Sequence, residues 1–147
     1  MEYHYGRLLD HVHLVVADLP ASKRFYTAVL QALGRELTGE GPDYFWADEL
    51  FVSCGSPASR SHVHLAFQTA DPARVQRFYQ AGLAAGGGDN GQPGERAYHD
   101  GYYAAYLTDP DGNNIEAVFH GPHWRSAASI QVQPRCQDVA APFTVCE

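Results

Sequence analysis

Three side chains that lie far apart along the chain, His11, His64 and Glu116, have the chemistry to hold one divalent metal ion. Neutral imidazoles and a carboxylate suit zinc, iron, manganese or nickel. Glu116 stands between Ile115 and Ala117, where a carboxylate is costly to bury unless it is paired or bound to a cation. The sequence therefore predicts one divalent ion of unspecified identity. The alternative is that the histidines are hydrogen-bonded core residues and the carboxylate faces solvent.

An internal repeat selects these two histidines from their neighbours. Residues 11–34 align without a gap with residues 64–87, at an offset of 53, and ten of the 24 positions are identical. In this register His13 and His62 have no histidine counterpart. Two equivalent strands that face each other would point the two selected histidines at a common point.

Each copy of the repeat has the order of one supersecondary unit. A β-rich start is followed by a helix that begins at Asp18 or Asp71, because aspartate side chains cap helix amides. Gly34 and Gly87 are suited to end these helices. Strands are then expected at residues 44–47 and 51–54, weakly at 35–37, and in the second half at 102–108 and 114–120.

These elements predict an α+β fold built from two tandem βαβββ modules. The modules cover about residues 7–56 and 60–120 and form one domain over residues 1–120, followed by a C-terminal extension at 121–147. The DPDG stretch at 109–112 suits a tight turn between two strands. The glycine-rich stretch at 86–94 lacks a phosphate-binding pattern and predicts a mobile loop.

The composition limits the kind of partner. The chain has 147 residues, 45% of them hydrophobic, and a formal net charge of −7, which argues against nucleic acid and anionic membranes as partners. Cys54, Cys136 and Cys146 are too widely spaced for a disulfide scaffold or a thiolate zinc site. No early apolar run is long enough to cross a bilayer. We expect a cytoplasmic protein that acts on a small molecule.

The stretches DHVHLVVADLPASKRFY, HVHLAF and LTDPDGNNIEAV, within residues 8–118, resemble the vicinal oxygen chelate superfamily. This superfamily contains glyoxalase I, fosfomycin-resistance thiol transferases, extradiol dioxygenases and bleomycin-resistance proteins. The resemblance implies a glyoxalase-like fold with a curved mixed sheet around the metal, whose ligands correspond to His11, His64 and Glu116. It also implies a homodimer in which His11 of one subunit can join the other two ligands of its partner.

The three-ligand set leaves positions open for substrate. We therefore expect a glyoxalase-like lyase or isomerase that chelates a small oxygenated substrate and stabilises an oxyanion or enolate by Lewis-acid catalysis. Glyoxalase I usually has a fourth carboxylate ligand, but residues 50–55 contain none, and only Asp48 and Glu49 lie nearby. The alternatives are an Fe(II) extradiol-type dioxygenase and a metal-free bleomycin-type binding protein. A fosfomycin transferase ranks lower because the expected pocket has few cations.

Four residues are predicted to take part in catalysis or substrate binding. Glu116 is the first, and His13, Tyr103 and Tyr106 follow from their positions beside the predicted ligands. His99 could close over the site from its loop, but a surface histidine is the simpler interpretation. No organic cofactor is expected.

Overall fold

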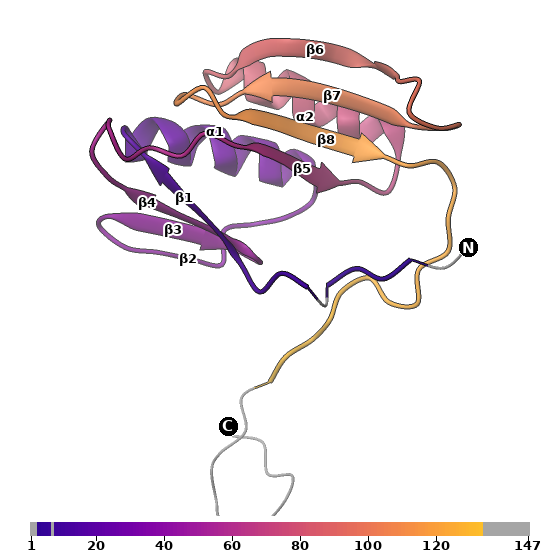
Figure 1. The fold of residues 1–147 in the computed structure, drawn as a ribbon, viewed down its shortest axis with the longest axis horizontal. Helices are drawn as coiled ribbons and strands as arrows, with labels where there is room; N and C mark the ends of the chain where they lie inside the picture. The colour runs from indigo at the N-terminus through magenta and orange to yellow at the C-terminus, as the bar shows by residue number, and fades with distance from the viewer. Residues whose placement is uncertain (1–2, 7, 134–147) are drawn as a thin grey trace, which may run out of the picture.

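The computed structural model describes residues 3–6 and 8–133, so Cys136, Cys146 and the end of the extension lie outside the described residues. The chain folds as two βαβββ modules in tandem, as predicted (Figure 1). The first comprises β1 (Val12–Val16), α1 (Leu19–Ala32), β2 (Gly39–Glu40), β3 (Tyr44–Ala47) and β4 (Leu50–Cys54). The second comprises β5 (His64–Gln68), α2 (Pro72–Ala84), β6 (Gly88–Glu95), β7 (Tyr103–Thr108) and β8 (Asn114–Phe119).

The two modules have the same sheet topology. Their strand orders are β1-β4-β3-β2 and β5-β8-β7-β6, with the first strand parallel to the last and the other pairs antiparallel. The expected mixed sheet is thus two separate four-stranded sheets. The weak prediction of a strand at residues 35–37 was wrong, because these residues form no strand. The strand that pairs with β3 is β2 (Gly39–Glu40), because a short turn at residues 41–43 connects it to β3 and brings the two strands side by side.

The helices begin as the sequence predicts. Asp18 and Asp71 cap α1 and α2 by accepting a hydrogen bond from the backbone N–H three residues further on, at 2.9 and 2.8 Å. Gly34, with φ of 77°, follows α1, whereas after α2 the positive φ falls on Gly86 rather than on Gly87. No helix in the described part of the chain is both long and apolar enough to cross a membrane.

The glycine-rich stretch at residues 86–94 is not a mobile loop, and that prediction was wrong. It forms most of β6, which pairs with β7 through two register shifts. Glycine tolerates this irregular ladder because it has no Cβ. At Gly91, φ is +150° and a Cβ would lie 2.9 Å from a ring carbon of Tyr106. Pairing with the neighbouring strand β7 holds this stretch in a regular conformation, and the local composition does not reveal that pairing.

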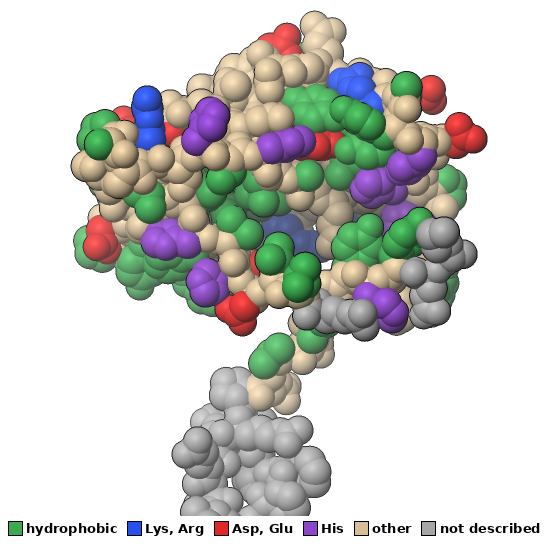
Figure 2. Space-filling view, viewed as in Figure 1, with side chains coloured by type: hydrophobic (Ala, Val, Ile, Leu, Met, Phe, Trp, Pro, Cys, Tyr) green, Lys and Arg blue, Asp and Glu red, His purple; other side chains and the backbone are tan. Residues whose placement is uncertain are grey.

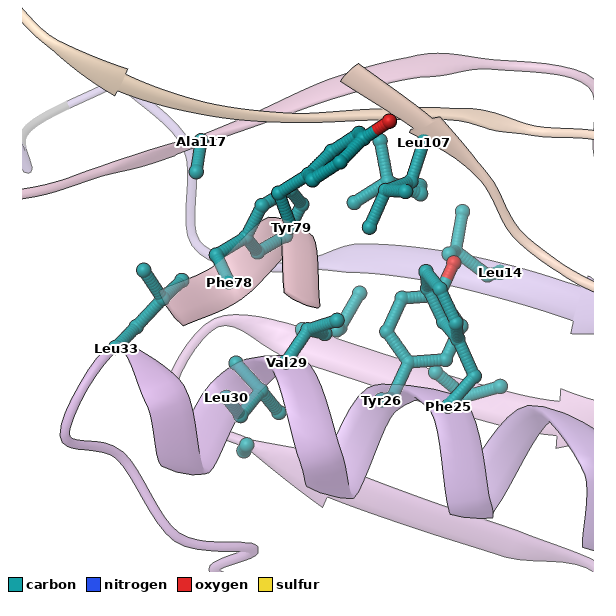
Figure 3. Packing of buried hydrophobic residues seen from close by; sticks show 14 of the residues in the cluster. Leu14, Phe25, Tyr26, Val29, Leu30, Leu33, Phe78, Tyr79, Leu107 and Ala117 are labelled. Carbon is teal, nitrogen blue, oxygen red and sulfur yellow. The ribbon is translucent and has the colours of Figure 1, made fainter. Parts of the chain in front are cut away.

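One hydrophobic core joins the modules. Helices α1 and α2 pack against each other, and buried side chains of both modules form one cluster (Figure 3). Val29 and Gly82 are equivalent positions in the repeat, and a Cβ on Gly82 would lie 3.0 Å from Val29 Cγ1 and 2.2 Å from Leu107 Cδ1. Absence of a side chain at Gly82 therefore lets the helices approach closely, and the two repeats are complementary in shape at this point.

The DPDG turn, which connects β7 to β8 as predicted, also fastens the two modules together. Asp109 is 4% exposed and accepts hydrogen bonds from Tyr26 Oη on α1 at 2.7 Å and from Asn113 Nδ2 at 2.8 Å. Two backbone N–H groups of the turn donate to its other oxygen, and Asp111 accepts from the backbone N–H of Ala17 at 3.1 Å. We call this network the DPDG clasp. Burial, and then the negative charge of Asp109, raise the pKa of Tyr26 well above its usual value.

Candidate metal centre

Glu116 lies at the middle of β8 on the face of the second sheet that is turned away from α2. Its neighbours Ile115 and Ala117 belong to the core cluster, and side chains alternate along a strand, so the carboxylate projects to the opposite face. Tyr106 of β7 and Ala66 of β5 are its register partners. Glu116 is only 2% exposed. The predicted carboxylate is therefore buried, which requires partners.

Both oxygens of this carboxylate have a partner. His64 Nε2 lies 2.8 Å from Glu116 Oε2, and the hydroxyl of Tyr102 donates to Oε1 at 2.6 Å. His64 is at the start of β5, and its side chain is about half exposed. The second module thus brings together two of the three predicted ligands, an imidazole and a carboxylate. Their atoms are lone-pair donors of the kinds that a divalent ion binds.

Two tyrosines that keep their hydroxyl protons, Tyr102 and Tyr106, lie beside the carboxylate of Glu116. Burial and the hydrogen bond to Glu116 raise the pKa of Tyr102, and burial with the charge of Glu116 raises the pKa of Tyr106. The Tyr102 hydroxyl therefore keeps the proton that it donates. The Tyr106 ring lies 6.1 Å from the His64 ring, and the Arg96 guanidinium lies 5.4 Å above the Tyr106 ring.

His11 does not join this pair within one chain. It lies directly before β1 in the first module, its side chain is 62% exposed, and its Nδ1 is 2.7 Å from Asp10 Oδ1. Within residues 3–6 and 8–133, no three His, Cys, Asp or Glu side chains come close enough to hold one metal ion. His11 as the third ligand stays a prediction.

The other predicted site residues lie in three different places. Tyr106 is beside Glu116, whereas His13 is on the first sheet, where its Nε2 lies 2.8 Å from Ser53 Oγ. Tyr103 packs against the core, and its hydroxyl accepts a hydrogen bond from Gln76 of α2. The structure therefore brings only Tyr106 of these three to the carboxylate. Asp48 forms an ion pair with Arg35 at 3.6 Å.

Sequence reasoning missed Tyr102 and His120, and for His99 it favoured a surface position over one at the site. A signal for Tyr102 was present, because residues an even number apart on an extended segment share a face, and 102 is four before 106. His99 and His120 hydrogen-bond to each other, and both rings contact Tyr102. His120 also had a signal, since it lies four residues after Glu116. His99 lies in a loop, where strand alternation does not apply, and its contact with Tyr102 agrees with the alternative that it closes over the site.

Comparisons with known proteins agree with this architecture. A profile of the "Glyoxalase/Bleomycin resistance protein/Dioxygenase superfamily" matches residues 8–117. A glyoxalase/bleomycin resistance protein from Albidiferax ferrireducens T118 is 31% identical, with 76% of this chain and 97% of that chain covered and a TM-score of 0.61. A glyoxalase-related enzyme from Fulvimarina pelagi is 20% identical, with 78% and 88% covered and a TM-score of 0.61.

A lactoylglutathione lyase from Agrobacterium tumefaciens, at 21% identity, 78% and 94% coverage and a TM-score of 0.55, shares the fold. No curated protein matches the sequence. The family match spans both modules and reaches one residue past Glu116, and the 31% identical relative covers three quarters of the chain. This chain belongs to the glyoxalase/bleomycin resistance protein/dioxygenase superfamily.

Proposed function

We propose that the protein is a divalent-metal-dependent enzyme, a lyase or isomerase, that acts on a small substrate with two adjacent oxygen atoms. The observation that carries this proposal is the buried carboxylate of Glu116 beside the imidazole of His64. Burial of a carboxylate at this depth in a sheet is energetically unfavourable, and binding of a cation offsets the lost hydration.

The residues that are present fit such an ion. His64 and Glu116 would hold it, and the hydroxyl of Tyr102 fixes one carboxylate oxygen so that the other is directed toward the imidazole. When bound, the ion supplies Lewis-acid stabilisation of negative charge on the oxygens of the substrate. The face of β7 and β8 on which Tyr106 lies would bind the rest of the substrate, with Arg96 above the Tyr106 ring to attract an anionic group.

We further propose that two copies of the chain assemble each site. One chain supplies two ligands, and His11 of a second copy would supply the third. The first sheet has a face turned away from its buried side that carries His13, Phe51 and Trp46, all at least partly exposed, and apolar side chains in this position favour contact with another protein surface. Figure 2 shows histidine side chains on one face of the molecule, over both modules, with hydrophobic side chains between them. A symmetric dimer would place the first sheet of each copy against the second sheet of the other.

A metal-free binding protein is the second candidate function. The observation that favours it is that the buried carboxylate already has a hydrogen-bond partner on each oxygen. In that case the His64–Glu116 pair would be a structural contact, and the same face of the sheet would bind an organic ligand without a metal.

The experiment that separates these functions is native mass spectrometry of the full chain. The protein is stripped with a chelator and then equilibrated in turn with Zn²⁺, Mn²⁺, Ni²⁺ and, under anaerobic conditions, Fe²⁺. We expect a dimer that takes up one ion per chain. In a separate thermal unfolding measurement, the ion should raise the free energy of unfolding by about 2.7 kcal/mol when the free ion is at 100 times its Kd. Failure of all four ions to bind in stoichiometric amounts would leave the metal-free binder. A monomer that binds one ion would contradict the shared site.

A further inference from the structure

Two histidines at the end of the second sheet form a pair that the metal centre does not explain. His120 directly follows β8 and, four residues beyond Glu116, lies on the same side of the strand. His99 lies in the loop between β6 and β7. The two rings are nearly parallel, at 18°, and His99 Nε2 lies 2.9 Å from His120 Nδ1. They are therefore joined by a direct hydrogen bond.

The partners of this pair determine where its protons lie. His99 Nδ1 is 2.9 Å from the backbone oxygen of Asp100, which can only accept, so His99 Nδ1 carries a proton. In a neutral ring the His99 Nε2 atom must then be an acceptor, and His120 Nδ1 must donate to it. The second nitrogen of His120, Nε2, is left with a free lone pair. An imidazole oriented in this way is ready to accept a proton.

The pair is one aromatic ring away from the carboxylate. The Tyr102 ring lies 5.2 Å from the His99 ring and 5.1 Å from the His120 ring, in edge-to-face contacts, while the Tyr102 hydroxyl binds Glu116. His120 is exposed, which leaves it accessible to a bound molecule. Tyr102 therefore links the position of both histidines to the position of the carboxylate.

We infer that His120 is the proton acceptor of this site, through its Nε2 atom, and that His99 is the residue that positions it. The inference rests on the proposed function and takes its substrate with two adjacent oxygen atoms to be an α-hydroxy carbonyl compound, in which the C–H bond at the hydroxyl carbon lies next to the carbonyl group. In the step, the C–H proton moves to His120 Nε2, the electron pair of that bond forms a C=C double bond, and the π pair of the carbonyl group moves onto its oxygen to give an enediolate. His120 then gives a proton to the enediolate at either carbon, and this proton is the original one or one exchanged with solvent, so that the carbonyl group re-forms and no oxidant or reductant is required.

The charges around His120 are consistent with a base that is neutral at physiological pH. Partial desolvation by the residues packed around one side of the ring lowers the pKa of His120, and the neighbouring His99 and His123 lower it further, while Glu116 opposes them and raises it. A lowered pKa favours the neutral form of His120, which is the form that can accept a proton.

The first arm of the test is the tautomer of His120 in the metal-free protein, measured by long-range ¹H–¹⁵N correlation after ¹⁵N-histidine labelling. We expect the proton on Nδ1 and a free Nε2 at pH 7.5. In His99→Phe, which keeps a ring but removes the acceptor, we expect His120 to shift toward a proton on Nε2. A proton on His120 Nε2 in the wild-type protein would overturn the inference.

The second arm measures proton abstraction with dihydroxyacetone as the probe. Zn²⁺-loaded protein is incubated with it in D₂O, and the loss of its C–H signal is followed by NMR against free Zn²⁺. We expect His120→Gln to slow the exchange by about 10²- to 10⁴-fold. The matched control His4→Gln, at an exposed histidine ahead of the first module whose charge is not among those that shift the pKa of His120, should exchange at the wild-type rate.

The pH dependence of the exchange rate distinguishes a positioning role of His99 from a general loss of structure in the variant. The exchange rate should rise as His120 loses its proton, and in His99→Phe the midpoint should move to higher pH because a neighbour that lowers the pKa of His120 is gone. His120→Gln that exchanges as fast as wild type would overturn the inference. No exchange by the wild-type protein would count against the proposed function instead, and the tautomer measurement would then decide the inference.

Discussion

Replacement of Glu116 by alanine is expected to lower the affinity for a divalent ion by more than about 100-fold, because even residues behind a metal ligand contribute 10- to 100-fold. The side chain provides the only negative charge of the predicted ligand set. Its loss leaves the imidazole of His64 without an anionic partner for the ion. Isothermal titration of the stripped variant with Zn²⁺ measures this effect directly.

The fold should survive this substitution. Removal of one partner from a buried pair is destabilising, but the His64 side chain is about half exposed, so water can replace the carboxylate at the imidazole, and Tyr102 loses its acceptor. Circular dichroism should therefore match that of the wild type. Glu95→Ala is a suitable control, because Glu95 is exposed and pairs in register with Tyr103, on the opposite face of the same sheet. Unchanged zinc affinity in Glu116→Ala would refute its assignment as a ligand.

The second large effect is expected on stability, in Asp109→Ala. This change would leave the Tyr26 hydroxyl, the Asn113 amide and two backbone N–H groups without their acceptor. Each buried donor left unpaired costs about 1 to 3 kcal/mol, and relief from burial of a charge offsets part of the sum. We expect a loss of about 3 to 5 kcal/mol in the free energy of unfolding, or on the order of 10 °C in Tm.

Urea denaturation followed by tryptophan fluorescence measures this loss. The control is Asp10→Ala, which removes the same groups from a side chain that is 97% exposed and should change stability by less than about 0.5 kcal/mol. A change in Asp109→Ala as small as in the control would show that the DPDG clasp does not hold the modules together.

The repeat was the most informative feature of the sequence. Identical residues at an offset of 53 predict two modules with equal topology, and the two sheets have equivalent strand orders. The same alignment selected His64, which contacts Glu116. It also places Val29 opposite Gly82, but complementary packing of these two residues depends on how the helices meet, which the alignment does not contain.

The errors have identifiable causes. Tyr103 and Tyr106 are an odd number of residues apart on β7, so they face opposite sides of the sheet, and period-two alternation favours Tyr102 over Tyr103. The glycine-rich stretch became β6 because β7 provides hydrogen bonds over its length, and such long-range pairing overrides a weak local preference. The clasp function of Asp109 required knowledge of where Tyr26 lies in three dimensions.

The most direct test of the shared metal centre mixes two variants that are each defective. His11→Ala and Glu116→Ala are stripped, combined at equal concentration, partly unfolded and refolded together, and titrated with Zn²⁺. In a site made by two chains, each mixed dimer keeps one intact site. About a quarter of the wild-type capacity should therefore return, since half of the dimers are mixed. Failure of the mixture to bind more zinc than the separate variants would contradict a metal centre that combines His11 of one chain with His64 and Glu116 of another.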